Sequence, residues 1–285
     1  MTAPKEAPKL GQFSWALFDW ANQPFFTIIT TFIFAPYFAN VLVGDPVKGQ
    51  SAWAFTQSAS GILIALMSPF LGAMADVWAV EMIQLSTHNG THLDAPYHFH
   101  STMDKALGEQ KRSWTIDEVP LEWCFQPGVK LDFRHFADGY VVTAADVEAE
   151  LNRIGHTLSP LEIVVVNTRA GSRYGHDDFV SAGCGMGYDA TMYLLERGVR
   201  LTGTDAWSWD APFVYTAQKY AATHDASLIW EGHKAGRDIG YCHLEKLHNL
   251  EAIPATGFYI SCFPHKIRGA SAGWTRAVAI FDEKL

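Results

Sequence analysis

The amino-acid sequence changes character near residue 77, and this break constrains the fold more than any other feature. No charged residue occurs from 25 to 44 or from 49 to 75, whereas all twelve histidines fall at or after residue 88. Each uncharged run is long enough to cross the roughly 30 Å apolar core of a bilayer as a helix. The sequence therefore predicts a two-helix hydrophobic hairpin in residues 1–77 and a different domain in 78–285.

The short polar stretch between the two runs favours a tight reversal of the chain. Asp45-Pro46 and Lys48-Gly49 are typical turn residues, and a reversal there places both ends of the hairpin on one side. Lys5 and Lys9 predict that this side is cytoplasmic. We expect the domain in 78–285 to be cytoplasmic, with membrane association through residues 13–76. The alternative is a pair of buried core helices.

The motifs in residues 13–76 support a more specific interpretation of the hairpin. Phe18-Asp-Trp-Ala-Asn22 and the segment from Ser68 to Asp76 resemble the first two helices of a major facilitator superfamily transporter. Such transporters place their substrate site between two halves of the molecule, and two helices cannot enclose it. The hairpin is therefore expected to be a transporter-like fragment without transport activity, serving at most as an anchor.

After residue 78 the sequence is typical of an α/β protein, because short apolar β-branched runs alternate with polar helical stretches. Helices are predicted at 144–153, capped by Thr143, and at 189–197, where Gly198 ends the helix. Strands are predicted at 80–86, 129–133, 162–167, 199–204, 257–262 and 275–281.

Composition excludes several classes of function. A formal net charge of -9 with no run of Lys or Arg leaves no surface for phosphate backbones, so no nucleic-acid partner is expected. The four cysteines contain no Cys-x-x-Cys pair, which fits neither a zinc ribbon nor a dense disulfide scaffold. We interpret them as reduced thiols.

Four candidate metal ligands lie within eleven residues of one another, at His88, His92, Asp94 and His98. Gly90 and Pro96 argue against a helix here, so we expect the end of a strand that turns into a loop. Two imidazoles and a carboxylate suit Zn²⁺ or Mn²⁺ and leave positions open for water, as in a catalytic site. The alternative, a set of unrelated core or surface histidines, is plausible for one residue but not for four.

The same residues carry a second resemblance. His-x-Gly-Thr-His-x-Asp-x-Pro-x-His matches the signature of the metal-dependent cyclase-like hydrolases, which include kynurenine formamidases and isatin hydrolases. The resemblance implies that His88, His92 and Asp94 bind metal and that His98 is a catalytic acid and base. It also implies that His233 and Glu245 either complete a second metal site, with Asp94 as a bridge, or line the active site.

The resemblance carries further expectations about the fold and the reaction. It implies a mixed-sheet, swivelling β/α/β hydrolase domain that forms a homo-oligomer, although the strands that usually precede the His motif are missing from this chain. The expected reaction opens an amide or lactam C–N bond with metal-activated water, with one or two ions bound. The expected substrate is a small aryl formamide or cyclic amide, because the aromatic residues from Trp207 to Tyr215 can stack on a planar ring; the alternative for these residues is ordinary core packing. The competing hypothesis is an inactive metal-binding domain.

Two weaker motifs suggest other chemistry. Gly269-Ala-Ser271-Ala-Gly273 matches a nucleophile elbow, but no histidine follows it, so we interpret it as a turn. His243 and His248 flank Glu245 without forming the His-Glu-x-x-His motif of a zincin.

Overall fold

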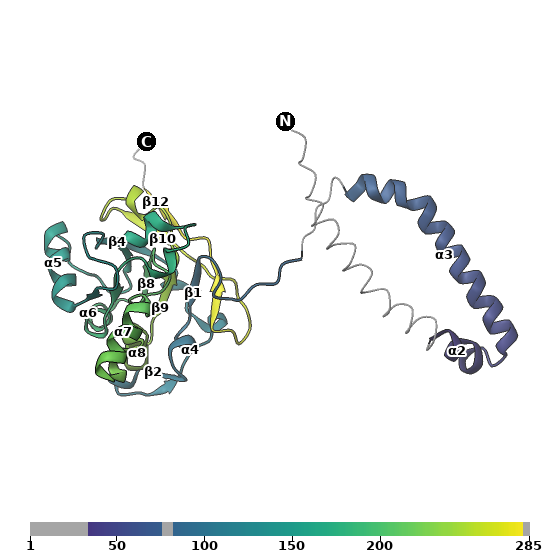
Figure 1. The fold of residues 1–285 in the computed structure, drawn as a ribbon, viewed down its shortest axis with the longest axis horizontal. Coiled ribbons are helices and arrows are strands. Elements are labelled where there is room, and N and C mark those ends of the chain that lie inside the picture. The colour runs from purple at the N-terminus through teal and green to yellow at the C-terminus, as the bar shows by residue number, and fades with distance from the viewer. Residues whose placement is uncertain (1–33, 76–81, 282–285) are drawn as a thin grey trace. The chain divides into compact units, whose positions relative to one another are not determined.

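A computed structural model of the chain describes residues 34–75 and 82–281. The chain divides into two compact units, residues 1–83 and 84–285, and each is described here by itself (Figure 1). The boundary expected at 77/78 lies outside the described residues.

The described part of the first unit is helical. It contains α2 (Ala35–Tyr37), a π-helical turn (Phe38–Leu42) and α3 (Pro46–Ala75). The Asp45 carboxylate accepts hydrogen bonds from the backbone N–H groups of Val47 and Lys48, both at 3.1 Å, and so starts α3. The ring of Trp53 packs against Phe38 at a centroid distance of 5.7 Å.

The prediction that residues 49–75 form a membrane-spanning helix is not supported by the structure. Over 34–75 and 82–281, no helix combines the length and the apolarity that a bilayer crossing requires. In the first half of α3, amide and hydroxyl side chains interrupt the uncharged run at Gln50, Ser51, Thr56, Gln57, Ser58 and Ser60. Absence of charge is therefore not the same as high hydropathy. The first predicted helix, 25–44, lies partly outside the described residues.

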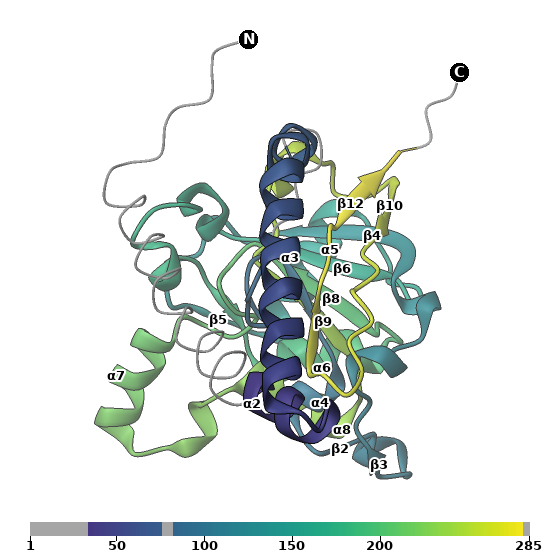
Figure 2. The ribbon, with the colours of Figure 1, turned by 90° about the vertical axis from the view of Figure 1, so that its right-hand side faces the viewer.

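The second unit is built on an eight-stranded mixed sheet in the order β11-β1-β9-β8-β6-β4-β10-β12. Strands β9, β8, β6 and β4 run parallel, and antiparallel pairs extend the sheet at both edges. Figure 2 shows the part of this sheet that runs from β12 to β9. The strand bounds are β1 (His92–Asp94), β4 (Phe125–Asp132), β6 (Ile163–Asn167), β8 (Leu201–Thr204), β9 (Cys242–Glu245), β10 (Phe258–Ser261), β11 (Ala272–Trp274) and β12 (Val278–Ile280).

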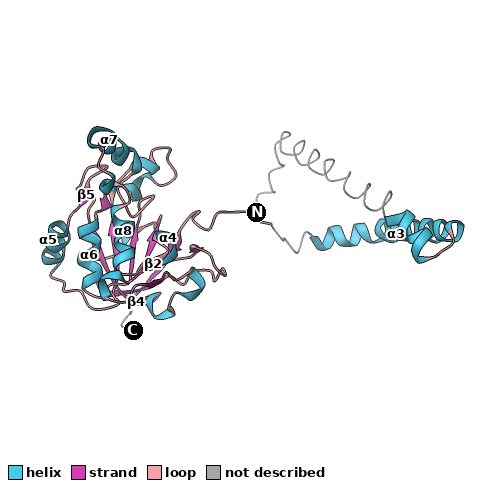
Figure 3. Cartoon of the chain, turned by 90° about the horizontal axis from the view of Figure 1, so that it is seen from below, coloured by secondary structure: helices cyan, strands magenta, loops and turns pink. Residues whose placement is uncertain are grey.

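Helices and two small sheets complete this unit. Helices α5, α6 and α8 lie in a row along the strands (Figure 3). The helices are α4 (Pro96–Phe99), α5 (Ala144–Ile154), α6 (Tyr188–Glu196), α7 (Phe213–Thr223) and α8 (Glu231–Asp238). The small sheets pair β2 (Thr102–Met103) with β3 (Lys111–Arg112), and β5 (Val141–Val142) with β7 (Gly185–Met186).

The central strands are apolar because both faces of the sheet are covered. Along β6, Val164 and Val166 pack in a core shared with α5 and α6, while Ile163 and Val165 pack in a second core with Leu244. A strand buried on both faces reads as an unbroken apolar run, and this is the pattern that predicted the parallel strands.

The predicted mixed α/β class is confirmed, and so are both predicted helices. Thr143 and Asp146 form a capping box at the start of α5, and Gly198 has φ +89° just after α6. The strand predicted at 80–86 is wrong over its described part, because residues 82–86 are largely exposed and pair with no strand among the described residues. The other five predicted strands overlap β4, β6, β8, β10 and β12.

Candidate metal centre

The site forms where two antiparallel strands align their polar residues. In the register of β1 and β9, His92 lies opposite Glu245 and Asp94 lies opposite His243. Side chains alternate along a strand, so these four share one face, while Leu93 and its cross-strand partner Leu244 point into the core on the other face. Pairing of two short strands therefore gathers residues that are about 150 positions apart in the sequence.

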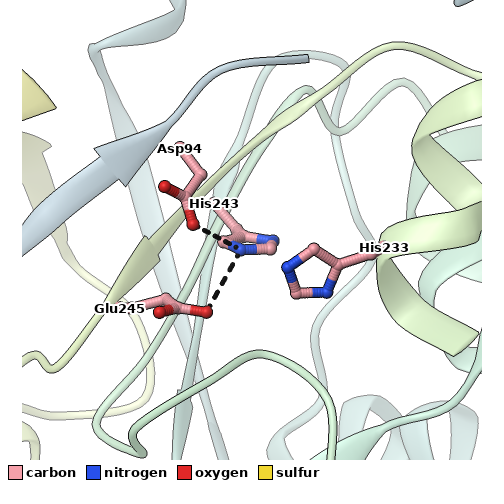
Figure 4. A group of neighbouring side chains, drawn as sticks. All are labelled: Asp94, His233, His243 and Glu245. Atoms are coloured by element: carbon pink, nitrogen blue, oxygen red, sulfur yellow. Dashed lines mark hydrogen bonds and ion pairs between the residues drawn. The ribbon is translucent and has the colours of Figure 1, made fainter. Parts of the chain in front are cut away.

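Asp94 contacts three histidines of the cluster, and Figure 4 shows its carboxylate beside His243. One carboxylate oxygen, Oδ2, accepts a hydrogen bond from His243 Nε2 at 3.0 Å. The other, Oδ1, lies 2.7 Å from His88 Nδ1 and 3.3 Å from His92 Nε2. Burial raises the pKa of Asp94, but its contacts with these three histidines outweigh that effect and hold the pKa well below its usual value. Asp94 is therefore a buried anion.

His233 comes from the first turn of α8 and faces the same cluster. The Asp210 carboxylate accepts hydrogen bonds from the backbone N–H of Gly232, at 2.7 Å, and from His233 Nδ1. Since Asp210 fixes both the start of the helix and one ring nitrogen, it sets the orientation of the imidazole. His233, His243, Asp94 and Glu245 offer ligand atoms within 4.8 Å of one another.

His98 lies beside the cluster on α4. Its Nε2 is 4.0 Å from Asp94 Oδ2, and its ring centroid lies 4.3 Å from that of His88. Burial lowers the pKa of His98 to about 4, against the opposite effect of Asp94. The imidazole is therefore neutral at neutral pH.

His243 was not predicted to belong to the site, because the sequence around it does not form the His-Glu-x-x-His motif of a zincin. It is fully buried, and although burial lowers its pKa, hydrogen bonds to Asp94 and Glu245 raise the pKa to about 9. Its Nδ1 contacts the hydroxyl of Tyr241 at 3.3 Å. The signal was the spacing of His243 and Glu245, because a separation of two places both residues on one face of a strand.

The donor set fits a divalent metal ion. Asp94 Oδ1 and His92 Nε2 are buried and have no hydrogen-bond partner within the described part of the chain, although each has nitrogen or oxygen neighbours within 3.3 Å. Buried polar atoms that converge without pairing are costly unless a further group satisfies them. Imidazole nitrogens and carboxylate oxygens are ligands that Zn²⁺ and Mn²⁺ accept. Two groups of possible ligands share Asp94, and together they contain all five residues predicted as metal ligands and also His243.

Two contacts orient the first histidines. His88 Nε2 lies 2.9 Å from the hydroxyl of Ser271, so Nδ1 is the nitrogen that faces Asp94. His92 Nδ1 lies 2.8 Å from the carbonyl oxygen of Gly90, which leaves Nε2 facing the cluster. The two imidazoles thus present opposite ring nitrogens. Ser271, which was predicted to lie in a turn, comes directly before β11, the strand that pairs with β1. The hydroxyl of Ser271 contacts His88 of the candidate metal centre.

A cavity of about 270 Å³ opens beside the cluster. His88, His98, His233 and Glu245 form one part of its wall, and the indole and phenyl rings of Trp207, Phe213 and Trp230 form another. Trp209, which was expected near the substrate, is instead fully buried in the core, and its indole N–H donates to Thr191. The cavity can hold a planar ring next to the polar cluster.

The sequence of the chain resembles those of known proteins. Residues 23–211 match the family described as Putative cyclase. The chain is 29% identical over 197 residues to a kynurenine formamidase from Salinibacter ruber, covering 69% of this chain and 77% of that protein. It is 25% identical to cyclase-like protein 3 from Arabidopsis thaliana, covering 80% of this chain and 74% of that protein.

The solved structures that resemble this chain include two isatin hydrolases. That from Labrenzia aggregata, bound to benzyl benzoate, superposes with a TM-score of 0.59 at 25% identity and covers 72% of this chain and 78% of its own. That from Ralstonia solanacearum has a TM-score of 0.60 at 23% identity, with coverage of 72% and 76%. A separate match of 66 residues, 30% identical, relates 22% of this chain to an uncharacterized MFS-type transporter of Bacillus subtilis but spans 15% of that protein. The chain belongs to the cyclase family.

Proposed function

We propose that residues 84–285 form a metal-dependent hydrolase that opens the C–N bond of an aryl formamide or a cyclic aryl amide. The observation that supports this most directly is the convergence of His88, His92, Asp94, His233, His243 and Glu245, with unpaired buried atoms, beside an aromatic cavity. The relatives that are kynurenine formamidases and isatin hydrolases support the same reaction class.

Zn²⁺ or Mn²⁺ would be held by His88, His92 and Asp94, and a second ion by Asp94, His233 and Glu245 with His243 as an additional donor. When bound, such an ion supplies Lewis acidity and lowers the pKa of water toward neutrality.

Other side chains around the cavity would transfer a proton and hold the substrate. His98 is neutral and lines the cavity, so it can accept a proton at Nε2 and pass it to the departing nitrogen. The rings of Trp207 and Phe213 would hold the aromatic group of the substrate and exclude water from it. Glu245, proposed as a ligand or an acid and base, is held by the backbone N–H of Trp209 at 3.2 Å. The oligomeric state stays a prediction.

The direct test is to purify the full chain, measure bound Zn and Mn by elemental analysis, and assay hydrolysis of N-formylkynurenine and isatin. We expect one or two metal equivalents with turnover that stops when a chelator removes the metal. The variant His98→Ala should keep its metal and lose most of its turnover, by about 10²- to 10⁴-fold, because it removes proton transfer alone. Folded protein that binds no metal would exclude the proposed function.

The contact between Ser271 and His88 leads to a separate expectation about metal affinity. Ser271→Ala removes the hydroxyl that orients the His88 ring, and loss of such a supporting hydrogen bond typically weakens metal binding by about 10- to 100-fold. Competition with a chromophoric chelator measures the change, and Ser271→Thr, which keeps a hydroxyl, is the matched control. Equal affinity in all three proteins would show that Ser271 does not support the site.

A further inference from the structure

Lys246 combines three unusual features at the wall of the cavity. It is the residue after β9, its backbone has φ +59°, and it is 5% exposed. Left-handed backbone is unfavourable for a residue with a side chain, and burial is unfavourable for an ammonium group. Strained and buried charged residues of this kind are concentrated at functional sites.

The backbone of Lys246 is fixed from both sides. Its N–H donates to the carbonyl oxygen of Ala206 at 3.0 Å, and its own carbonyl oxygen accepts from the hydroxyl of Thr91 at 2.7 Å. These bonds hold the residue in its conformation and direct the side chain to the cavity, where it forms part of the wall. The position of the ammonium is therefore set by the fold.

The ammonium group has more donors than partners. It donates to Glu245 Oε2 at 3.0 Å and lies 4.5 Å from the centroid of the Trp207 ring. An ammonium group has three N–H donors, and Glu245 is its one hydrogen-bond acceptor within residues 34–75 and 82–281. The ammonium group of Lys246 can therefore donate a further hydrogen bond to an oxygen atom of a bound ligand.

The carboxylates of the cavity wall are already engaged by the protein. Asp210 accepts from Gly232 and His233, and Glu245 accepts from Trp209 and Lys246. Among the described residues of the wall, Lys246 is the one lysine or arginine, and it lies next to the Trp207 ring. An aromatic group that carries an anion matches both features at once.

We propose that Lys246 binds a carboxylate carried by the aromatic group of the substrate, so that the preferred substrates are anionic aryl amides. This inference rests on the proposed hydrolase function and narrows its substrate class. The alternative role of Lys246, as a counter-ion for Glu245 alone, predicts no preference between anionic and neutral ring compounds.

Binding of benzoate and benzamide distinguishes the two roles without turnover. Isothermal titration of the full chain as purified, metal included, should show benzoate binding at least about tenfold more tightly than benzamide, since a charge-assisted hydrogen bond is stronger than a neutral one. Lys246→Met keeps an unbranched side chain of nearly the same length but removes the ammonium group, and it should abolish the preference. Lys105→Met, at an exposed site away from the cavity wall, should retain it. A wild-type protein without the preference, or a Lys246→Met variant that keeps it, would overturn the proposal.

Turnover then separates this inference from the proposed function. We expect 2-formamidobenzoate to be hydrolysed with a lower KM than formanilide, and Lys246→Met to raise the KM of the anionic compound more than that of formanilide. A wild-type protein that prefers benzoate but hydrolyses neither amide would refute the hydrolase and leave the anion site in place. Hydrolysis of both amides with equal KM would refute the anion site and leave the hydrolase.

Discussion

Asp94→Asn is expected to remove bound metal and to lower kcat/KM by more than about 10³-fold, beyond the loss seen when one electrostatic group is removed from a preorganised site. The carboxamide keeps the shape of the side chain but lacks the charge. Asp94 contacts His88, His92 and His243 within 3.3 Å, and both groups of candidate ligands include it. This one substitution should therefore lower the affinity of the site for every metal ion that it can hold.

The control for Asp94→Asn is Asp132→Asn. Asp132 pairs with Arg134 at 2.6 Å on a more exposed part of the unit, so the same change of chemistry should leave metal content and kcat/KM within about twofold, as expected for a weak exposed ion pair. Elemental analysis and initial-rate kinetics measure both quantities. An Asp94→Asn protein that retains its full metal content would show that the cluster does not bind metal through this residue.

The sequence predicted the strands whose identity depends on their own residues. The run in β6 is apolar because both faces are covered, and this pattern can be read locally. Strands β1 and β9 were missed because histidine and carboxylate side chains interrupt their apolar residues, and β11 was missed because Ala-Gly-Trp contains no β-branched residue. Their pairing, such as His92 opposite Glu245, forms between distant segments and leaves no local pattern.

The residues of the candidate site were likewise predicted where they are close in the sequence and missed where they are distant. The array of His88, His92, Asp94 and His98 could be recognised because its members are close in the sequence. His243 could not be assigned, since its role depends on lying opposite Asp94 across two strands. Ser271 was interpreted as a turn for a similar reason, because its partner His88 lies 183 residues away.

The hydrophobic hairpin shows a different limit of sequence patterns. An uncharged run was taken as a membrane helix, but α3 carries polar side chains in its first half and does not meet the requirement for a bilayer crossing. Counting charges alone treats glutamine and serine as apolar.

Leu244→Ala should destabilise the full chain by about 2–5 kcal/mol, the usual range for removing a buried leucine side chain. Leu244 is fully buried and lies between His243 and Glu245 on β9, in the core that also contains Leu93 and Ile163. Urea unfolding of metal-free protein measures the effect without the stabilisation that bound metal adds. Val278→Ala is the matched control, because Val278 is 43% exposed, and we expect it to change the free energy of unfolding by less than about 0.5 kcal/mol.

The same Leu244→Ala variant also tests how the core and the metal centre are coupled. Leu244 and its cross-strand partner Leu93 pack on the face of the sheet opposite the ligands, so a cavity at Leu244 weakens the support that holds His243 and Glu245 opposite β1. We therefore expect the metal affinity of Leu244→Ala to fall although no ligand is changed. If the free energy of unfolding drops while metal affinity stays at the wild-type value, the ligands are positioned by contacts on their own face, such as those from Trp209 and Tyr241, and not by the core beneath them.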